Sequence, residues 1–402
     1  MTAFASDDIL DLAVIGGGVM GLFTAYHASG AGARVAVLEA GRIGDPGTAS
    51  YGRTRSYRRD YLDPRYVRLA DEAMRLWSEF ERDCGTRALV RCGCMNIAAE
   101  TVTPELASTY GRLSAAVMRR LGLDPEALGP AQITERFGYL HADEAYLDDA
   151  AGVVDVTAVT DALLRALAQR KVTVHEGVEV AGIADDGETV RVTTDVGDVT
   201  ARALVITAGH GTNEVLRRLD GCELEIPLTR DRPSEAKYYV PRPAERSRFT
   251  ADRMPVMAYL DTGIYVHPIV DGVTEAVKIG YYNPPDVPRG TTGIGSIAEF
   301  VDQCMPGLRD AQVTDVRDVD QCDYDLVGDD EFVLGLVPGH RAVAVGVGWR
   351  GTGYKFAPWV GRVLHQLALQ QGTVYDVAQF DPARFIDSVT GPVDVLRGDE
   401  VH

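Results

Sequence analysis

The chain is poor in basic residues, in cysteine and in long apolar runs, and each shortage excludes a class of protein. Its 40 basic residues face 59 acidic ones, so the formal net charge is −19, which repels nucleic acid and anionic membranes. Six cysteines in 402 residues exclude a disulfide scaffold, and Cys92-Gly93-Cys94 lacks the second pair of a zinc site. No apolar run approaches the roughly 18 residues that cross a bilayer, and the N-terminus carries no basic leader. We therefore expect a globular protein of the reducing cytoplasm, with no nucleic-acid partner, no membrane partner and no metal site.

What remains is an ordinary globular composition in a long chain. Apolar residues make up 46% of the sequence and charged residues 25%, which are average values for folded domains. A chain of 402 residues exceeds the size at which a single core stops growing, so two domains are expected. Of the basic residues only Lys171, Lys237, Lys278 and Lys355 are lysines. Because arginine is used wherever a positive charge is enough, a lysine within a motif needs a specific explanation.

The N-terminal segment has the pattern of a dinucleotide-binding unit. A short apolar strand (11–15) leads into GGGVMG at 16–21, a helical run follows, and a second strand (34–38) ends at Glu39. In this context Gly16 allows the tight turn, Gly18 allows close approach of a pyrophosphate, and Gly21 allows helix and strand to pack. The free N–H groups at the start of the helix would face the phosphates. Glu39 is placed to accept a hydrogen bond from a ribose hydroxyl.

Apolar periodicity predicts the remaining elements. The first strand's sheet is expected to resume at Ala203–Gly209, after a meander over Lys171–Thr200. Leu224–Tyr282 has the composition of antiparallel strands in a second domain. A helix is expected to begin at Asp63, with Tyr66, Leu69, Ala73, Met74, Trp77 and Phe80 as its core face. Two more helices are expected over Pro104–Leu121 and Thr157–Lys171. Near the end of the chain, strands at Phe332–Gly335 and Ala342–Val347 lead through a second glycine loop into a helix over Phe356–Leu369.

Three further segments carry motifs that belong with the first one. They are Ser50–Arg58, Val277–Tyr281, and Cys322-Asp323-Tyr324 together with Gly351–Phe356. With the glycine motif and Glu39, they resemble the flavin-dependent amine oxidases of the D-amino acid oxidase superfamily, and most of all monomeric sarcosine oxidase and N-methyltryptophan oxidase. The resemblance runs from Leu12 to about Leu369. It implies an α/β fold in which a discontinuous Rossmann-type FAD-binding domain (1–85, 150–220 and 318–402) carries an inserted α+β substrate domain (86–149 and 221–317) built on an antiparallel sheet.

The resemblance assigns the cofactor residues. FAD is expected on the glycine motif, with the other contacts from Glu39, Ser50, Thr54, Arg55, Val178, Gly351 and Gly353. Cys322 resembles the cysteine that the family joins to the flavin ring by a thioether, a bond that raises the oxidising power of the ring. The alternative for Cys322 is a buried structural thiol, which is what we expect of the other five cysteines.

The resemblance also assigns the residues that act on O2 and on the substrate. Lys278 resembles the lysine beneath the flavin that activates O2, since a compact ammonium stabilises the anion formed when oxygen accepts an electron; the alternative is a solvated lysine on an exposed strand. Lys355 and Arg58 resemble the two cations that hold a substrate carboxylate. Arg53 and Arg59 are expected to be surface or ion-pair residues.

The sequence departs from the sarcosine oxidase pattern at two positions. Tyr282 and Thr352 stand where that family has histidines, four residues after the oxygen lysine and three before the carboxylate lysine. Tyr282 could still hydrogen-bond an amine or a carboxylate, and Arg350 could reach a second acidic group on a larger substrate. Tyr265 and His267 are further pocket candidates or, alternatively, packed core residues.

The expected function is FAD-dependent oxidation of the C–N bond of an amino acid or N-substituted amino acid to an imine, with O2 reduced to H2O2. One alternative is a biosynthetic oxidase in natural-product assembly, acting on a cyclic imino acid or a larger amino-acid-derived secondary amine; the loss of both histidines favours it. A second is a flavin dehydrogenase that uses another electron acceptor. A third is a noncatalytic flavoprotein or NAD-binding module, which would have no reason to keep Lys278, Cys322 and Lys355.

Overall fold

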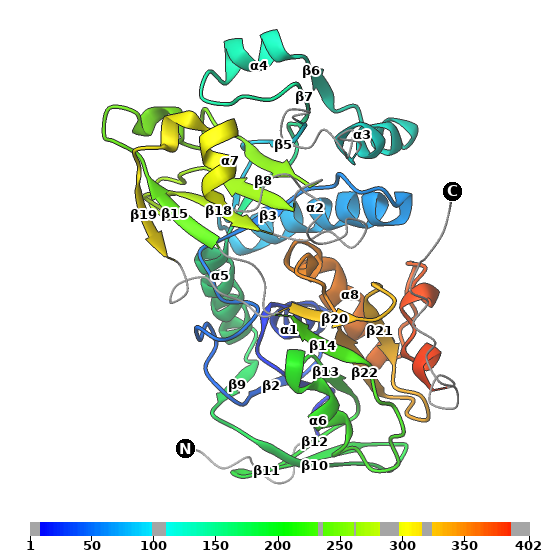
Figure 1. Cartoon of the computed structure of the whole chain (residues 1–402). Coiled ribbons are helices and arrows are strands. Elements are labelled where there is room, and N and C mark those ends of the chain that lie inside the picture. The colour runs from blue at the N-terminus through cyan, green and yellow to red at the C-terminus, as the bar shows by residue number, and fades with distance from the viewer. Residues whose placement is uncertain are drawn as a thin grey trace.

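The computed structural model describes residues 9–98, 110–231, 236–260, 263–281, 297–315 and 324–386. Within these residues two large sheets occupy opposite halves of the molecule (Figure 1). One sheet has six strands and the other has eight. Both termini of the described chain belong to the half that contains the six-stranded sheet.

The six-stranded sheet is built from apolar strands that are distant in sequence. Its order is β21-β22-β13-β1-β2-β9, and every neighbouring pair except β21 and β22 is parallel. The predicted return of the chain to this sheet is confirmed, because Val205 lies beside Val14. Its strands are β1 (Leu12–Ile15), β2 (Val35–Glu39), β9 (Thr173–Glu176), β13 (Leu204–Ile206), β21 (Val333–Leu336) and β22 (Val343–Val347).

Two different layers cover the faces of this sheet, as the side-chain alternation of a strand requires. Leu12 and Val14 point into a core formed mainly with four helices, and Ala13 and Ile15 point into a second core under a three-stranded antiparallel sheet. The helices are α1 (Val19–Gly30), α2 (Pro64–Cys84), α5 (Val156–Gln169) and α8 (Ala357–Ala368), and the strands are β10 (Val180–Asp185), β11 (Val190–Thr194) and β12 (Gly197–Ala201).

The prediction of one meander over Lys171–Thr200 is wrong at its beginning. Only β10, β11 and β12 form an antiparallel sheet, whereas β9 pairs in parallel with β2. An edge strand of a parallel sheet leaves one face partly exposed, so its apolar residues alternate as they do in an antiparallel strand. Local alternation therefore cannot distinguish the two arrangements.

The eight-stranded sheet has the order β19-β15-β18-β17-β16-β5-β7-β6 and is antiparallel except between β16 and β5. One face packs in a core that contains Val266 and Ile279 and is joined by Phe300 of α7. The opposite face carries Cys94, Ala258 and Tyr265. The elements are β5 (Cys94–Ala98), β6 (Glu126–Leu128), β7 (Glu144–Asp148), β15 (Ala236–Val240), β16 (Val256–Tyr259), β17 (Ile264–His267), β18 (Val277–Tyr281), β19 (Gln312–Asp315) and α7 (Ile297–Cys304).

Two further small sheets join segments that are distant in sequence. In the first, β3 (Thr54–Tyr57) and β4 (Leu89–Val90) pair with β8 (Gly152–Asp155), and in the second β14 (Leu228–Asp231) pairs with β20 (Tyr324–Val327). The remaining helices are α3 (Tyr110–Arg120), α4 (Pro130–Arg136) and α6 (Thr212–Leu216). The first six residues of the predicted helix at 104–121 lie outside the described part of the chain.

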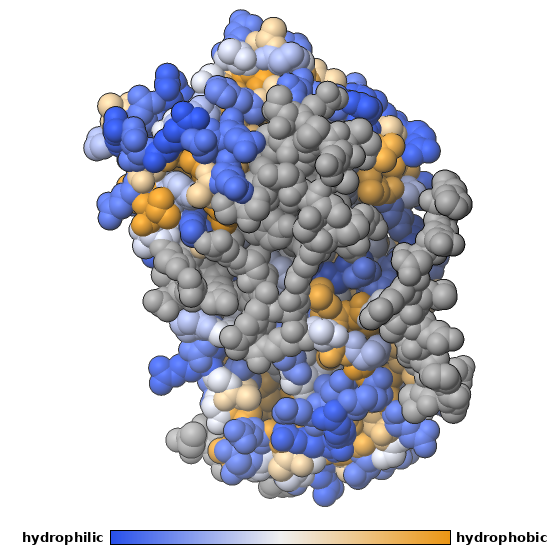
Figure 2. All heavy atoms as spheres, in the orientation of Figure 1, coloured by the Kyte–Doolittle hydropathy of each residue, from blue (hydrophilic) through white to orange (hydrophobic). Residues whose placement is uncertain are grey.

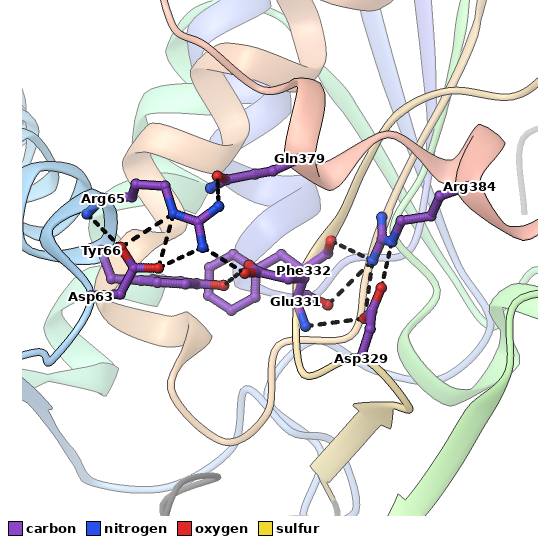
Figure 3. A network of polar contacts seen from close by, with 8 residues as sticks. All are labelled: Asp63, Arg65, Tyr66, Asp329, Glu331, Phe332, Gln379 and Arg384. Atoms are coloured by element: carbon purple, nitrogen blue, oxygen red, sulfur yellow. Dashed lines mark hydrogen bonds and ion pairs between the residues drawn. The ribbon is translucent and has the colours of Figure 1, made fainter. Parts of the chain in front are cut away.

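Helix α2 is anchored at its first turn by polar side chains. Asp63 caps the helix by accepting a hydrogen bond from the Arg65 backbone N–H at 2.7 Å, and the Tyr66 hydroxyl donates to Glu331 at 2.7 Å. Figure 3 shows how this network continues through Arg65 and Glu331 to the C-terminal segment, where Arg384 binds Asp329. Of the predicted core face of α2, Tyr66, Ala73, Trp77 and Phe80 are buried, and Leu69 and Met74 are half-buried against the same core.

The visible surface is predominantly hydrophilic, and apolar residues form small separate groups among the coloured atoms of Figure 2. Large exposed apolar side chains in the described ranges are isolated ones, such as Leu113 and Val374. None of the helices in those ranges combines the length and apolarity that a membrane crossing requires.

Candidate active site

The first glycine motif folds as a close-packed turn between β1 and α1. Gly16 has a φ of +104°, and a Cβ there would lie 2.4 Å from the carbonyl oxygen of Thr207. A Cβ on Gly21 would lie 1.9 Å from the carbonyl oxygen of Gly16, and one on Gly18 would lie 3.1 Å from Ser50 Oγ. Side chains at Gly16 and Gly21 would push α1 away from the sheet. The predicted reasons for glycine at positions 16 and 21 therefore agree with the geometry.

The predicted cofactor residues of the first half lie around the carboxyl ends of β1 and β2. Glu39 accepts hydrogen bonds from the backbone N–H groups of Gly17 at 2.6 Å and Gly41 at 2.8 Å. Ser50 Oγ accepts from Val19 N–H at 2.9 Å at the start of α1, and Val178 N–H donates to the carbonyl of Glu39 at 3.0 Å. The carboxyl edge of an open parallel sheet is where such folds bind nucleotides.

The second glycine loop connects β22 to α8 and is equally crowded. A Cβ on Gly351, whose φ is +66°, would lie 2.6 Å from the Tyr324 ring, and one on Gly353 would lie 2.4 Å from Trp349 Cβ. Between these elements Arg350 adopts a φ of +54°, a conformation that is strained for any residue but glycine. Its N–H donates to the carbonyl of Asp325 at 3.0 Å, which helps to hold the loop in this shape.

Strand β3 lies beside this loop and carries two of the predicted residues. Arg55 donates to the carbonyls of Thr54 at 3.0 Å and of Tyr51, and its guanidinium lies 5.8 Å from the centre of the Tyr354 ring. Thr54 is fully buried, and its hydroxyl is hydrogen-bonded to Nδ1 of His267 at 2.8 Å. The Ser56 hydroxyl is bonded to the other ring nitrogen of His267 at 2.7 Å. His267 thus joins β17 to β3.

Lys278 lies on the face of the eight-stranded sheet that turns toward β3. It is opposite His267 in the ladder between β17 and β18, so the two side chains share one face. The residue is only 3% exposed, and its ammonium lies 5.8 Å from the centre of the Tyr265 ring. The alternative of a solvated lysine on an exposed strand is therefore wrong. Tyr265 and His267, the two further pocket candidates, lie on the adjacent strand β17, with the Tyr265 ring beside this ammonium and His267 opposite Lys278 in the ladder.

Arg58 and Lys355, predicted to act together, lie near the same aromatic ring. The Arg58 guanidinium is 4.8 Å and the Lys355 ammonium 5.8 Å from the centre of the Tyr61 ring, and both residues are buried. Lys355 donates to the carbonyl of Thr352 at 2.9 Å, and the Trp77 indole donates to the carbonyl of Lys355 at 2.8 Å. Burial, reinforced by the nearby Arg58, holds the pKa of Lys355 well below its usual value.

Asp60 and Asn96 belong to this cluster, and sequence reasoning missed both. Asp60 Oδ1 accepts a hydrogen bond from Arg58 at 2.9 Å, and its Oδ2 accepts one from Asn96 at 3.0 Å. The spacing of Arg58 and Asp60 is a weak signal of a local ion pair. Nothing in the sequence connects Asn96 to them, because the contact depends on where β5 lies.

Of the other predicted residues, some lie outside the described part of the chain and some have structural roles. Tyr282 and Cys322 lie outside the described residues, so their roles stay predictions. The remaining cysteines are free; burial raises the pKa of Cys92 to about 11 and that of Cys304 to about 12, as expected of structural thiols. Arg59 forms the expected ion pair, with Asp148 at 2.7 Å.

These features together fit a bound dinucleotide. Two glycine loops, at 16–21 and 348–353, lie at the carboxyl ends of β1 and β22 in one sheet, and side chains at their tightest glycines would fill the turns. Arg55 and Tyr354 link β3 to the second loop. The residues that would hold FAD are therefore assembled on one edge of the six-stranded sheet.

Several known proteins are similar to this chain over almost its whole length. Peroxisomal sarcosine oxidase of Homo sapiens is 28% identical over 398 residues, covering 95% of this chain and 97% of that protein. Monomeric sarcosine oxidase of Arthrobacter sp. (strain TE1826) is 28% identical and covers 92% of this chain and 95% of its own length. Among solved structures, NikD, an amino acid oxidase essential for nikkomycin biosynthesis, shares the fold with a TM-score of 0.74 at 24% identity, covering 93% of this chain and 98% of that one.

A family model decides the assignment. The model described as FAD dependent oxidoreductase matches residues 11–367, a range that contains both glycine loops, Arg58, Lys278 and Lys355. The chain belongs to this family of FAD-dependent oxidoreductases.

Proposed function

We propose that this protein is an FAD-dependent oxidase that converts the C–N bond of an amino acid or N-substituted amino acid to an imine. The observation that carries the proposal is the pair of buried cations, Arg58 and Lys355, near one aromatic ring beside the second glycine loop. Two buried cations at this place suit a small ligand with a carboxylate. The sarcosine oxidase relatives and NikD act, by their names, on sarcosine and on an amino acid.

The residues of the chain would perform three tasks. Arg58 and Lys355 bind the substrate carboxylate, which fixes the position of the C–H bond next to nitrogen. A bound carboxylate also favours the charged form of Lys355, whose pKa burial has lowered. Lys278 offers a buried ammonium from the other side of β3, where it would stabilise negative charge that develops on oxygen. Bound FAD would supply the two-electron acceptor and, on reoxidation by O2, give H2O2.

A covalent bond between Cys322 and the flavin is part of the proposal. It is supported by the C-x-Y spacing of the motif, whose tyrosine, Tyr324, lies against Gly351 of the second glycine loop. Precipitating the purified protein with acid tests it directly. A yellow pellet is expected, and a colourless pellet with flavin in the supernatant would show that FAD is held without a covalent bond.

The decisive experiment is anaerobic bleaching of the flavin by a substrate panel, followed by measurement of H2O2 in air. The panel contains sarcosine, N-methyl amino acids, proline, pipecolate and carboxymethyl amines. Bleaching by at least one member with stoichiometric peroxide is expected. Bleaching without peroxide would identify a dehydrogenase, and a purified protein without flavin would contradict the proposal.

A second candidate is a biosynthetic oxidase of a cyclic imino acid or a larger secondary amine. It is favoured by Thr352, which replaces a histidine of the sarcosine oxidases and whose hydroxyl donates to the Trp349 carbonyl at 3.3 Å. This hydroxyl is committed to the loop, so position 352 is not equipped to bind sarcosine as a histidine would. Rapid turnover of sarcosine alone, with no reaction of pipecolate or proline, would exclude this candidate.

A further inference from the structure

The guanidinium of Arg58 is already held by a carboxylate of the chain. Both of its hydrogen bonds among the described residues leave from Nη1, one to Asp60 Oδ1 and one to the Asp60 carbonyl, each at 2.9 Å. Asp60 cannot turn away, because its other oxygen accepts a hydrogen bond from Asn96 at 3.0 Å. Arg58, Asp60 and Asn96 are all at least nine-tenths buried.

This arrangement fixes which part of Arg58 meets a ligand. A guanidinium is a rigid planar fork with five N–H groups. When Nη1 is occupied by Asp60, Nε and Nη2 form the remaining edge. A carboxylate binds such an edge with two parallel hydrogen bonds, so the contact with Asp60 orients Arg58 for bidentate binding without blocking it.

Asp60 also affects Lys355 through its charge. The charged and titratable groups that face the Lys355 ammonium are Arg58, Arg350, Asp60 and Cys94, and the rings of Tyr61 and Phe356 lie beside it. The two arginines favour the neutral amine, whereas Asp60 opposes them. Without this carboxylate, three cations would repel one another in a buried place.

We infer that Asp60 is a positioning residue for carboxylate recognition, which orients the Nε–Nη2 edge of Arg58 and favours the charged form of Lys355. Asn96 supports it by fixing the second carboxylate oxygen. The inference rests on the proposed function, in which Arg58 and Lys355 bind a carboxylate. It adds that Asp60, in the loop after β3, and Asn96, on β5, contribute to the specificity for the substrate.

The test is titration of the flavin-loaded protein with acetate, followed by calorimetry between pH 6 and pH 9. The main variant is Asp60→Asn, which removes the charge but keeps the shape and an acceptor for Arg58; alanine would leave a buried arginine unpaired and endanger folding. Asn96→Ala removes the support without changing any charge. Asp148→Asn is the matched control, because Asp148 forms a similarly buried pair with Arg59 at 2.7 Å outside the cluster.

In Asp60→Asn the dissociation constant for acetate is expected to rise roughly tenfold at neutral pH, the effect of losing one charge-assisted contact. The pH at which acetate binding is lost should also move downward, which a purely structural role of Asp60 would not cause. Asn96→Ala should weaken binding in the same direction but less, and Asp148→Asn should match the wild type.

Two results would overturn the inference, and they are distinguishable. If Asp60→Asn binds acetate as well as the wild type or better, with an unchanged pH profile, Asp60 has no positioning role or competes with the ligand. The proposed carboxylate site would still stand if Arg58→Met loses acetate binding. If Arg58→Met binds acetate like the wild type, the proposed site fails, and the role of Asp60 fails with it.

Discussion

At the scale of single residues, the burial of Lys278 determines what its substitution should change. Methionine has a similar length but no charge, so Lys278→Met should slow reaction of the reduced protein with O2 by roughly 100- to 1,000-fold, the usual cost of losing one electrostatic contact to a developing anion. Anaerobic reduction by substrate should change little. Stopped-flow absorbance of the two half-reactions measures both effects.

The control for this experiment is Lys171→Met, because Lys171 is exposed at the end of α5. It should leave both half-reactions unchanged. An equal loss of reduction and reoxidation in Lys278→Met would mean that the lysine supports the structure of the site instead of acting on oxygen.

Gly21→Ala tests the packing of the first glycine motif. Its new methyl group would lie 1.9 Å from the Gly16 carbonyl oxygen, so α1 has to move, at a cost of roughly 1–3 kcal/mol. Less flavin per protein and a lower unfolding temperature are expected. Gly182→Ala on β10, where no atom lies within 4 Å of the added methyl, should do neither, and full flavin content in Gly21→Ala would contradict the packing argument.

Single residues were predictable where one local constraint dominates. Gly16 and Gly21 follow from strand, turn and helix in one short segment, and their crowding confirms that reasoning. Asp60 and Asn96 could not be predicted as partners, because their contact depends on how the loop after β3 meets β5. For His267 the sequence left a packed core residue open, and only the structure reveals its bonds to the two hydroxyls on β3.

At the scale of elements, the contact between α1 and α8 should make stability depend on pH. His27 donates from Nε2 to the Pro358 carbonyl at 2.8 Å and stacks on His365 with 5.9 Å between ring centres. Burial lowers the pKa of His27 to about 3 and also lowers that of His365. The folded protein keeps the His27 ring neutral down to about pH 3 and disfavours protonation of His365, whereas the unfolded chain binds protons at both rings below about pH 6.5.

Stability should therefore be unaffected by these rings above pH 6.5 and fall as the pH drops from 6.5 toward 3. His27 contributes a loss of about 1.4 kcal/mol per pH unit in that window, and His365 adds to the loss in the same direction. His27→Gln keeps a donor for Pro358 and should lose about 2 kcal/mol less than the wild type between pH 6.5 and 5. Urea unfolding measures this, with the exposed His141→Gln as control; parallel pH profiles for wild type and His27→Gln would refute the assignment.

Elements were predictable where periodicity and length agree, as in α2, whose core face was identified from the sequence. The exception is β9, which alternates like a meander strand but pairs with β2. The register of a strand and the identity of its partner strand depend on residues far away in the sequence, so alternation within four residues does not encode them. The domain boundaries stay predictions for the same reason, because β3, β4 and β8 form one sheet from three separate segments.

At the scale of the whole molecule, the net charge of −19 should make stability depend on ionic strength. Excess charge of one sign repels itself in the compact state, and salt screens this repulsion. The unfolding temperature is expected to rise when sodium chloride increases from 20 to 300 mM. Chloride is preferable to sulfate, which also strengthens apolar burial. A falling unfolding temperature would show that favourable ion pairs outweigh the repulsion.

The place of β3 between His267 on one side and Tyr354 on the other has a consequence for how the substrate preference of such a protein can evolve. The glycines that would hold the cofactor are crowded by their neighbours and resist replacement, whereas Arg58, one of the two cations of the proposed carboxylate site, follows directly after this one short strand. Substitutions accumulated over evolution at 59–61 and at Asn96 would then alter which substrate the proposed site accepts while the residues that would hold the cofactor stay the same.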